Sequence, residues 1–421
     1  MNKIRIDIDE LGPVRHQQIH LAPLMLFTGE SGLGKSYVNF LAYYLFDVFS
    51  SERMSGFIRF CIDNKSNTDA SFDFEIQRQA LCDWLEQDVR EFFKYLYNYE
   101  DIRCKVHFAI EAYCPETLTF SYVRKRKIAQ LNDTDLYLFT LSQGEARHTV
   151  LTLDTHIEEQ LCRHTTQLLG RRILGTDISR SLLLPPGRAS LLTGDFTAQK
   201  GSSKIGLYDK FLQDNDWINL RVLRAEGDPR EKEQRARRIQ QLIKARLTSE
   251  KDGIFIETPD KARIPLSAAA SSIRELTPLL QWILGGSIAQ QAMCIEEPEA
   301  HLHPEMQVAI ADLLAVCSHE GAYMQITTHS DYLMQRVNQL IKYGNIRKQR
   351  PEDYAQLCLQ HGHDEGCYLD SDSLVAYYFS SENGTTRIEE LEVGTEGIPM
   401  STFFRAIELL TKEDEFLNAE A

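Results

Sequence analysis

The stretch that decides the fold reads Gly29-Glu30-Ser31-Gly32-Leu33-Gly34-Lys35-Ser36. It matches the pattern G-x-x-x-x-G-K-[ST] at every fixed position. Residues 19–27 before it are apolar enough for a buried strand, and residues 35–49 after it have the composition of a buried helix. A chance match is the alternative, but the strand–loop–helix context disfavours it. We therefore expect a phosphate-binding loop here.

The residue types of this loop suit a nucleotide. Glycines let the backbone bend so that several N–H groups face phosphate oxygens, and the helix N-terminus adds partial positive charge. We expect the main chain of residues 29–34 to hold the phosphates and Lys35 to reach the β- and γ-phosphates. The Ser36 hydroxyl is a candidate Mg²⁺ ligand. The predicted cofactors are therefore ATP and Mg²⁺.

The composition excludes several classes of protein. The chain has 421 residues, of which 43% are hydrophobic and 25% charged, and a net charge of -15. These values exclude a disordered or collagen-like chain and disfavour a general nucleic-acid coat protein. Neither a membrane-spanning run of about 18 apolar residues nor a signal peptide is visible. Nine cysteines without C-x-x-C spacing fit a reducing compartment, so we expect a cytoplasmic protein.

The chain divides into three predicted parts. Residues 1–50 contain the phosphate-binding loop. Residues 51–250 are predicted to form a mainly helical insertion lobe. Residues 251–421 alternate strands and helices, which is typical of an α/β fold.

A short acidic segment marks a second candidate site. The apolar strand 292–295 is followed by Glu296, Glu297 and Glu299. Carboxylates at a strand's C-terminal end lie where open α/β sheets bind ligands. One could hold Mg²⁺ while its neighbour orients or deprotonates a water. A later apolar strand leads to His329, which could hydrogen-bond a γ-phosphate, although a lone histidine is more often structural.

Together these motifs resemble a known family. The set GESGLGKS (29–36), IEEPEAHLHP (295–304) and ITTHSD (326–331) resembles the ABC-type ATPase heads of the OLD/RecF/SMC-like group. The resemblance implies an α/β P-loop NTPase fold with a large, mainly helical insertion. It places Glu296 at the Walker B magnesium position, Glu297 as the catalytic glutamate and His329 as the switch histidine.

Such heads dimerise, and a signature segment of one subunit closes the ATP site of the other. The candidate segment is 266–276, with Ser271 and Ser272 as the nucleotide-binding residues. Relatives often have glycine where this chain has Ile273. Glycine permits a close approach of the backbone to a phosphate, whereas isoleucine does not. Either the serines and the helix N-terminus suffice, or closure is weak or partner-assisted. Alternatively, the serines cap the helix and Glu275 completes a capping box.

Three weaker signals remain. Cys358, His361, His363 and Cys367 lie within ten residues, although zinc sites usually use two separated pairs, so a polar loop is preferred. The segment 228–247 carries seven Lys/Arg against three acids and could contact nucleic acid or form a solvated helix face. Residues 184–188, LPPGR, resemble a recurrent segment of the same group, and we assign them no role.

The resemblance implies an ATP-driven switch that acts as a homodimer or higher oligomer. Similar chains serve as ATPase subunits of Septu-like, retron-associated or PARIS-like anti-phage systems, where a neighbouring gene supplies a nuclease or toxin effector. The alternative is a DNA repair or chromosome-maintenance ATPase of RecF/SMC type. The charge of -15 favours a protein partner over DNA. A transporter ATPase and a non-hydrolysing scaffold fit the motifs less well.

Overall fold

A nine-stranded sheet lies at the centre of the described part of the chain, in the order β5-β1-β2-β16-β15-β3-β14-β13-β9. The computed structural model describes residues 1–62, 70–131, 134–193, 205–224, 229–250, 252–399, 411–415 and 417. The strands of this sheet are β1 (Arg5–Leu11), β2 (Val14–His20), β3 (Leu24–Gly29), β5 (Cys104–Ala109), β9 (Arg180–Leu184), β13 (Gln291–Glu296), β14 (Tyr323–Thr327), β15 (Leu374–Glu382) and β16 (Thr385–Leu391).

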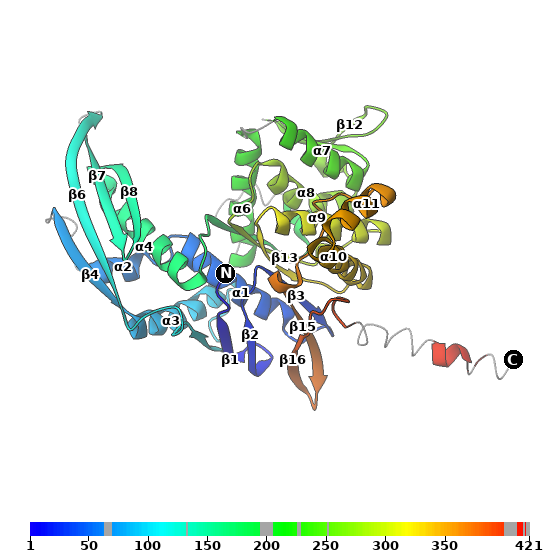
Figure 1. Cartoon of the computed structure of the whole chain (residues 1–421), viewed down its shortest axis with the longest axis horizontal. Helices are drawn as coiled ribbons and strands as arrows, with labels where there is room; N and C mark the ends of the chain where they lie inside the picture. The colour runs from blue at the N-terminus through cyan, green and yellow to red at the C-terminus, as the bar shows by residue number, and fades with distance from the viewer. Residues whose placement is uncertain are drawn as a thin grey trace.

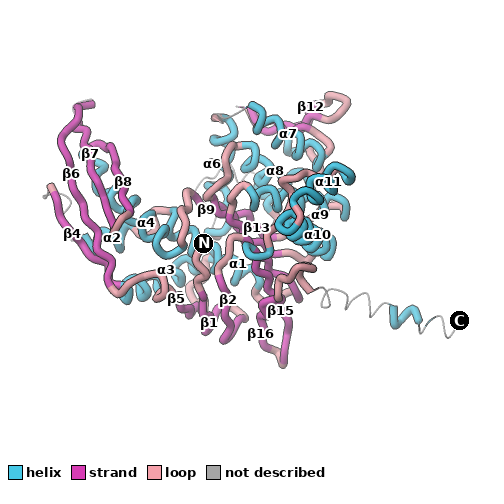
Figure 2. Tube along the Cα trace, in the orientation of Figure 1, coloured by secondary structure: helices cyan, strands magenta, loops and turns pink. Residues whose placement is uncertain are grey.

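Helices surround this sheet (Figures 1 and 2). The helices are α1 (Lys35–Ser50), α2 (Ser55–Ile62), α3 (Arg78–Tyr97), α4 (Ile157–Leu174), α5 (Arg188–Thr193), α6 (Gly206–Leu223), α7 (Pro229–Ile243), α8 (Ser271–Leu284), α9 (Pro304–His319), α10 (Asp331–Gln349) and α11 (Pro351–His361). No helix in the described ranges is both long and apolar enough to cross a lipid bilayer.

The centre of the sheet is parallel and buried on both faces. β9, β13, β14, β3 and β15 run parallel as successive neighbours. Alternate residues of β3 enter different cores, because successive side chains of a strand point to opposite faces. Met25 and Phe27 pack with α1, whereas Leu24 and Leu26 pack with α8, α9 and α10. The predicted α/β P-loop NTPase fold is confirmed by this arrangement.

The segment 51–250 does not form one separate helical lobe. It contributes β5 to the main sheet beside β1, and β9 beside β13. It also forms a four-stranded sheet of β4 (Ser71–Gln77), β6 (Thr117–Leu131), β7 (Thr134–Gln143) and β8 (Ala146–Leu153). This sheet projects from the body as an arm (Figure 1). The expected single insertion lobe is therefore corrected to an arm plus two strands of the main sheet.

The reason lies in the periodicity of these strands. Along β4, Phe74 and Ile76 are buried while the residues between them are exposed. Along β6, Phe120 and Tyr122 are buried in the same way. Strict alternation of this kind builds a sheet with one covered face. β9 is almost uniformly buried instead, which suits a strand inside a parallel sheet.

A smaller sheet completes the fold beside α7. It consists of β10 (Arg246–Glu250), β11 (Gly253–Glu257) and β12 (Arg263–Pro265), paired antiparallel in that order. The chain then passes through a short 3-10 helix, Leu266–Ala268, before it enters α8. This sheet therefore leads into the signature-like segment from outside the main sheet (Figure 1).

Gly29 fixes the start of the phosphate-binding loop. Its φ is +117°, and a Cβ there would lie 2.2 Å from the carbonyl oxygen of Phe379 on β15. The next residue, Glu30, donates its N–H to that same oxygen at 2.9 Å. Only glycine fits, because both the backbone conformation and the close approach of β15 exclude a side chain.

Gly29→Ala is expected to destabilise the protein by about 3 kcal/mol, since strain at positive φ and overpacking add together. Gly32→Ala is the matched control. It also has positive φ, at +78°, but no atom lies within 4 Å of its added Cβ. The control should therefore lose only about 1–2 kcal/mol. Urea unfolding of both variants measures this difference, and equal losses would contradict the packing of Gly29 against Phe379.

Candidate nucleotide site

Three parallel strands end side by side at one edge of the sheet. β3, β14 and β13 are neighbours, and they end at Gly29, Thr327 and Glu296. The C-terminal ends of parallel strands in an open α/β sheet form its usual ligand crevice. The phosphate-binding loop, the acidic segment after Glu296 and the loop with His329 therefore share this edge.

Lys35 is held inside the phosphate-binding loop. Its Nζ donates to the carbonyl oxygens of Gly29 at 3.1 Å and Glu30 at 2.6 Å, and the residue is 6% exposed. Burial lowers the pKa of Lys35, while the carboxylates of Glu297, Glu296 and Glu30 oppose this shift. The ammonium group thus lies close to the acidic segment and to the main chain expected to bind phosphate.

Glu296 is the buried acid of the site. Its Oε2 accepts a hydrogen bond from Ser36 Oγ at 2.5 Å, and its Oε1 accepts one from Asn39 Nδ2 at 2.5 Å. The residue is 2% exposed. Burial raises the pKa of its carboxyl, although the bonds from Ser36 and Asn39 act in the opposite direction. The two candidate Mg²⁺ ligands predicted from sequence, Ser36 and Glu296, are therefore in direct contact.

Glu297 occupies a strained turn just beyond β13. Its φ is +44°, which is uncommon for a residue other than glycine. Its N–H donates to the carbonyl oxygen of Thr327 at 3.2 Å, and it lies at the same distance from the Thr327 hydroxyl. This turn leaves the Glu297 side chain half-buried next to the loop rather than in the sheet. Strained residues of this kind often mark functional sites.

Glu299 ties the acidic segment to the loop that carries His329. Its Oε1 accepts from the Thr328 hydroxyl at 2.8 Å and from the His329 N–H at 2.7 Å. The His329 ring has a lowered pKa, mainly because of burial and secondly because of Lys35, whereas Glu297 raises it. His329, Lys35 and Glu297 therefore lie close enough to influence one another electrostatically.

The signature-like segment leads into α8, but its serines do not cap this helix. Ala270 is the N-cap of α8, and no side chain caps it. Glu275 is buried, and its carboxylate binds the N–H groups of Arg188 and Ala189 instead. The predicted capping box is therefore wrong. Within the described ranges, neither Ser271 nor Ser272 hydrogen-bonds to the phosphate-binding loop of its own chain.

Two site residues lacked a sequence assignment. Asn39 lies one turn after Ser36 on α1, and a fully buried asparagine in a largely apolar helix was the available signal. Glu299 belonged to the recognised acidic run, but its contact with His329 depends on the turn at Glu297. Neither contact follows from a motif, because each joins residues brought together only by the sheet.

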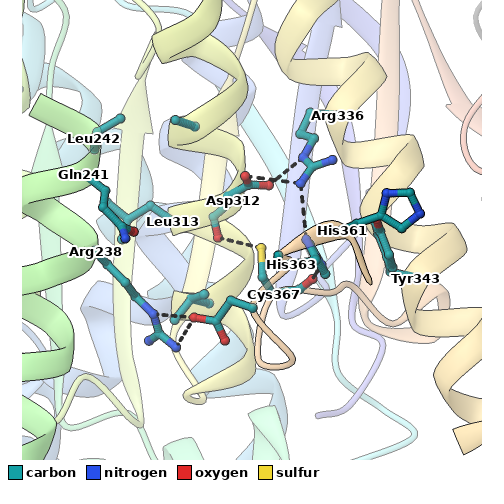
Figure 3. Close-up of a pocket in the computed structure, with 14 residues that line it drawn as sticks. Arg238, Gln241, Leu242, Asp312, Leu313, Arg336, Tyr343, His361, His363 and Cys367 are labelled. Atoms are coloured by element: carbon teal, nitrogen blue, oxygen red, sulfur yellow. Dashed lines mark hydrogen bonds and ion pairs between the residues drawn. The ribbon is translucent and has the colours of Figure 1, made fainter. Parts of the chain in front are cut away.

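The Cys/His cluster forms a different structure from a metal site. His363 stacks on Tyr343 with ring centroids 3.9 Å apart, and its Nε2 is 2.6 Å from the Cys367 carbonyl oxygen. These residues line a cavity of about 380 Å³ between α7, α9 and α10, where Arg336 pairs with Asp312 (Figure 3). Among the described residues, no group of three potential ligands is placed to hold a metal ion.

The cations of α7 are largely neutralised by ion pairs. Arg235 pairs with Glu320 at 2.9 Å, Arg237 with Glu233 at 3.0 Å, and Arg238 with Asp364 at 2.6 Å. Paired guanidinium groups offer less free charge to a phosphate backbone. The α7 segment is therefore a weaker candidate for nucleic-acid contact than its sequence suggested.

A family model matches part of this chain. Residues 195–335 match the family described as "AAA domain, putative AbiEii toxin, Type IV TA system". This part of the chain is therefore similar to an AAA domain. The match contains Glu275, Glu296, Glu297 and His329, but the phosphate-binding loop lies outside it. A comparison with curated protein sequences found no match.

Solved structures that are similar to this chain include several SMC heads. One is an SMC head bound to the C-winged helix domain of ScpA, with 11% identity, 93% of this chain and 98% of that chain covered, and a TM-score of 0.39. An SMC head domain from Thermotoga maritima has 12% sequence identity, with 93% of this chain and 100% of that chain covered, and a TM-score of 0.34. A third is an Smc head domain with an extended coiled coil, bound to the C-terminal domain of ScpA derived from Pyrococcus furiosus. It has 11% sequence identity, with 98% of this chain and 100% of that chain covered, and a TM-score of 0.38. The fold of this chain is assigned from its own strand order and phosphate-binding loop.

Glu296→Gln is expected to stabilise the metal-free protein at neutral pH. Burial raises the folded-state pKa of Glu296, so the unfolded chain releases this proton at lower pH than the folded chain. The stability contributed by Glu296 therefore falls as pH rises from about 4.3, the unfolded value, through the raised folded value. Glutamine keeps the shape without the charge, and each unit of raised pKa corresponds to about 1.4 kcal/mol.

Urea unfolding in EDTA tests this expectation at pH 7.5 and below pH 4. The variant should exceed the natural protein in stability at pH 7.5, and the difference should vanish at the lower pH, where both forms are neutral. A variant that is less stable at pH 7.5 would show that the Glu296 charge is already compensated.

Proposed function

We propose that this chain is an ATP-binding and ATP-hydrolysing ABC-type switch that dimerises through its nucleotide sites and controls an effector protein. The contact between Ser36 and Glu296 carries the proposal, since it places a buried carboxylate beside the hydroxyl of the phosphate-binding loop at 2.5 Å. Magnesium prefers such oxygen ligands and in nucleotide sites is held by one or two protein groups plus phosphates. The AAA domain match over residues 195–335 supports the assignment.

The donor set fits Mg²⁺ on its own chemistry. Glu296 is 2% exposed, and its two carboxylate oxygens accept hydrogen bonds from neutral groups, the Ser36 hydroxyl and the Asn39 amide. A bound cation would add to the charge compensation that Lys35 provides. Ser36 and Glu296 would hold the ion, whose charge helps neutralise the phosphates when bound. Lys35 would exchange its carbonyl partners for the β- and γ-phosphates. The N–H groups of residues 29–34 would hold the remaining phosphate oxygens.

Hydrolysis is assigned to the residues beyond the strand ends. Glu297 is half-buried, and its carboxylate acts to raise the pKa of both Lys35 and His329. A carboxylate in this place can orient a water and accept its proton. The His329 ring, with a lowered pKa, would meet the γ-phosphate as a neutral hydrogen-bond donor.

The dimer is proposed from the position of α8. Ser271 is exposed at the first turn of α8 and Ser272 follows it. A helix N-terminus with hydroxyl groups suits an anion, here the ATP of a second subunit. Ile273 packs against the apolar core, so it leaves the serine hydroxyls facing outwards. Closure of two heads by ATP and their release on hydrolysis would form the switch.

A protein effector is the proposed target of this switch. The matched family description names a toxin and a type IV toxin–antitoxin system. The net charge of -15 and the ion-paired α7 favour a protein over nucleic acid as the first partner. We propose that a neighbouring gene supplies a nuclease or toxin in a cytoplasmic anti-phage system. A RecF/SMC-type role on DNA is the alternative.

Glu297→Gln is expected to bind ATP with unchanged affinity but to hydrolyse it at least about 100-fold more slowly, because general-base catalysis contributes at least this much. It should also accumulate closed dimers with ATP and Mg²⁺, visible by light scattering. Lys35→Ala is the contrasting variant and should lose ATP binding in calorimetry. Unchanged turnover in Glu297→Gln would move the base elsewhere.

The effector is expected to co-purify with this chain when both neighbouring genes are expressed together. Protection of cells from phage should require both genes and should be lost in Glu297→Gln. A neighbouring permease gene, or DNA-stimulated hydrolysis without any protein partner, would favour the competing assignments instead.

A further inference from the structure

A completely buried arginine joins the signature-like helix to the acidic strand end. Arg188, the first residue of α5, is 0% exposed. Its Nη1 donates to the carbonyl oxygens of Glu296 at 2.8 Å and Pro185 at 3.0 Å. Its Nε donates to the carbonyl oxygen of Glu275 at 2.8 Å. One guanidinium therefore bonds to the end of β13, the turn after β9 and the first turns of α8.

Glu275 completes the link from the side of α8. It is also 0% exposed, and its carboxylate accepts the N–H groups of Arg188 at 3.2 Å and Ala189 at 2.7 Å. Arg188 Nη1 lies 3.8 Å from Glu275 Oε1, which makes a fully buried ion pair. Buried pairs of this kind are often no more stabilising than apolar residues of the same volume. Their presence therefore calls for a role beyond stability.

The positions of the two ends suggest that role. Glu275 lies one helical turn after Ser271, whose N-terminal segment is proposed to meet the ATP of a second subunit. The other end of the link is the main chain of Glu296, directly before Glu297. A planar guanidinium with a fixed fork of donors transmits position better than a flexible ammonium group. Arg188 thus connects α8 to the residue that directly precedes the turn at Glu297.

The surroundings of Arg188 extend the link towards His329. Burial lowers the pKa of Arg188, while Glu275, Glu299, Glu296 and Glu297 oppose this effect. Within the described part of the chain, Arg188 Nη2 and Glu299 Oε2 are buried without a hydrogen-bond partner. Glu299 holds the His329 N–H through its other oxygen. Arg188 therefore interacts electrostatically with the acids of the β13 end and with Glu275.

We propose that Arg188 and Glu275 are positioning residues that couple the engagement of α8 by a second subunit's ATP to the placement of Glu296 and Glu297. This inference rests on the proposed function. Neither residue touches nucleotide in this scheme, since both are buried behind the strand end.

Arg188→Lys tests the coupling, because lysine keeps the charge but cannot bond three carbonyl oxygens in the same geometry. We expect kcat to fall by about 10-fold or more, since small displacements of catalytic groups cost up to about 100-fold. The KM and the ATP affinity by calorimetry should change less than about threefold, as expected for loss of a contact that acts only on the chemical step. Arg53→Lys is the control, since Arg53 forms a partly buried bidentate pair with Asp88 away from β13. The control should retain normal kcat, and an equal fall in both variants would overturn the proposal.

Glu275→Gln keeps the proposal testable if Arg188→Lys unfolds, as thermal melting would show. It retains one acceptor oxygen and should lower kcat in the same way. The double variant should be no slower than the slower single variant, because both changes break one link. Independent, multiplying losses would overturn the coupling.

Hydrogen exchange separates this inference from the proposed hydrolysis. ATP with Mg²⁺ should slow exchange of amides 271–276 and 296–300 in the natural protein. In Arg188→Lys the change at 271–276 should remain while that at 296–300 is lost. This uncoupling would support the inference even if the natural protein proved not to hydrolyse ATP. Persistence of both changes in the variant, or no change at 271–276 with ATP bound, would overturn it while leaving ATPase activity unaffected.

Discussion

The carboxylate of Glu296 is buried at the end of β13 and accepts hydrogen bonds from Ser36 and Asn39 of α1. A carboxylate is costly to bury, and the hydrogen bonds from Ser36 and Asn39 offset part of that cost, so this contact constrains the elements that carry it. It fixes the rotation of α1, because Ser36 and Asn39 must share one face one turn apart. It also fixes the register of β13 against β14, since the turn at Glu297 is held by Thr327.

Two cores hold this edge of the sheet from opposite sides. α1 covers one face, and α8, α9 and α10 cover the other. The segment between residues 51 and 250 adds β5 and β9 to the sheet and carries the projecting arm. The candidate nucleotide site thus lies at the strand ends of the main sheet, whereas the four-stranded arm projects from the body. Such an arrangement lets added elements differ without moving the strand ends.

The ion pair of Arg188 and Glu275 is completely buried beside the candidate site. Arg188 is buried among carboxylates that stabilise its cation against burial. Removing either partner of a buried pair is much more damaging than replacing both. The pair therefore ties α8 to the end of β13 through the Glu275 and Glu296 carbonyl oxygens. This link matters for the proposed switch, in which dimer closure at α8 would affect ATP hydrolysis at Glu297.

The sequence alone determined the phosphate-binding loop, the acidic strand end and the α/β class, because each depends on local spacing and periodicity. No local pattern could place β9 beside β13, since sheet neighbours are chosen by long-range packing. Glu275 shows the same limit. Its spacing predicted a local cap, whereas the tertiary structure gave it Arg188 as a partner. Contacts between distant segments have no sequence period, so only the folded sheet decided them.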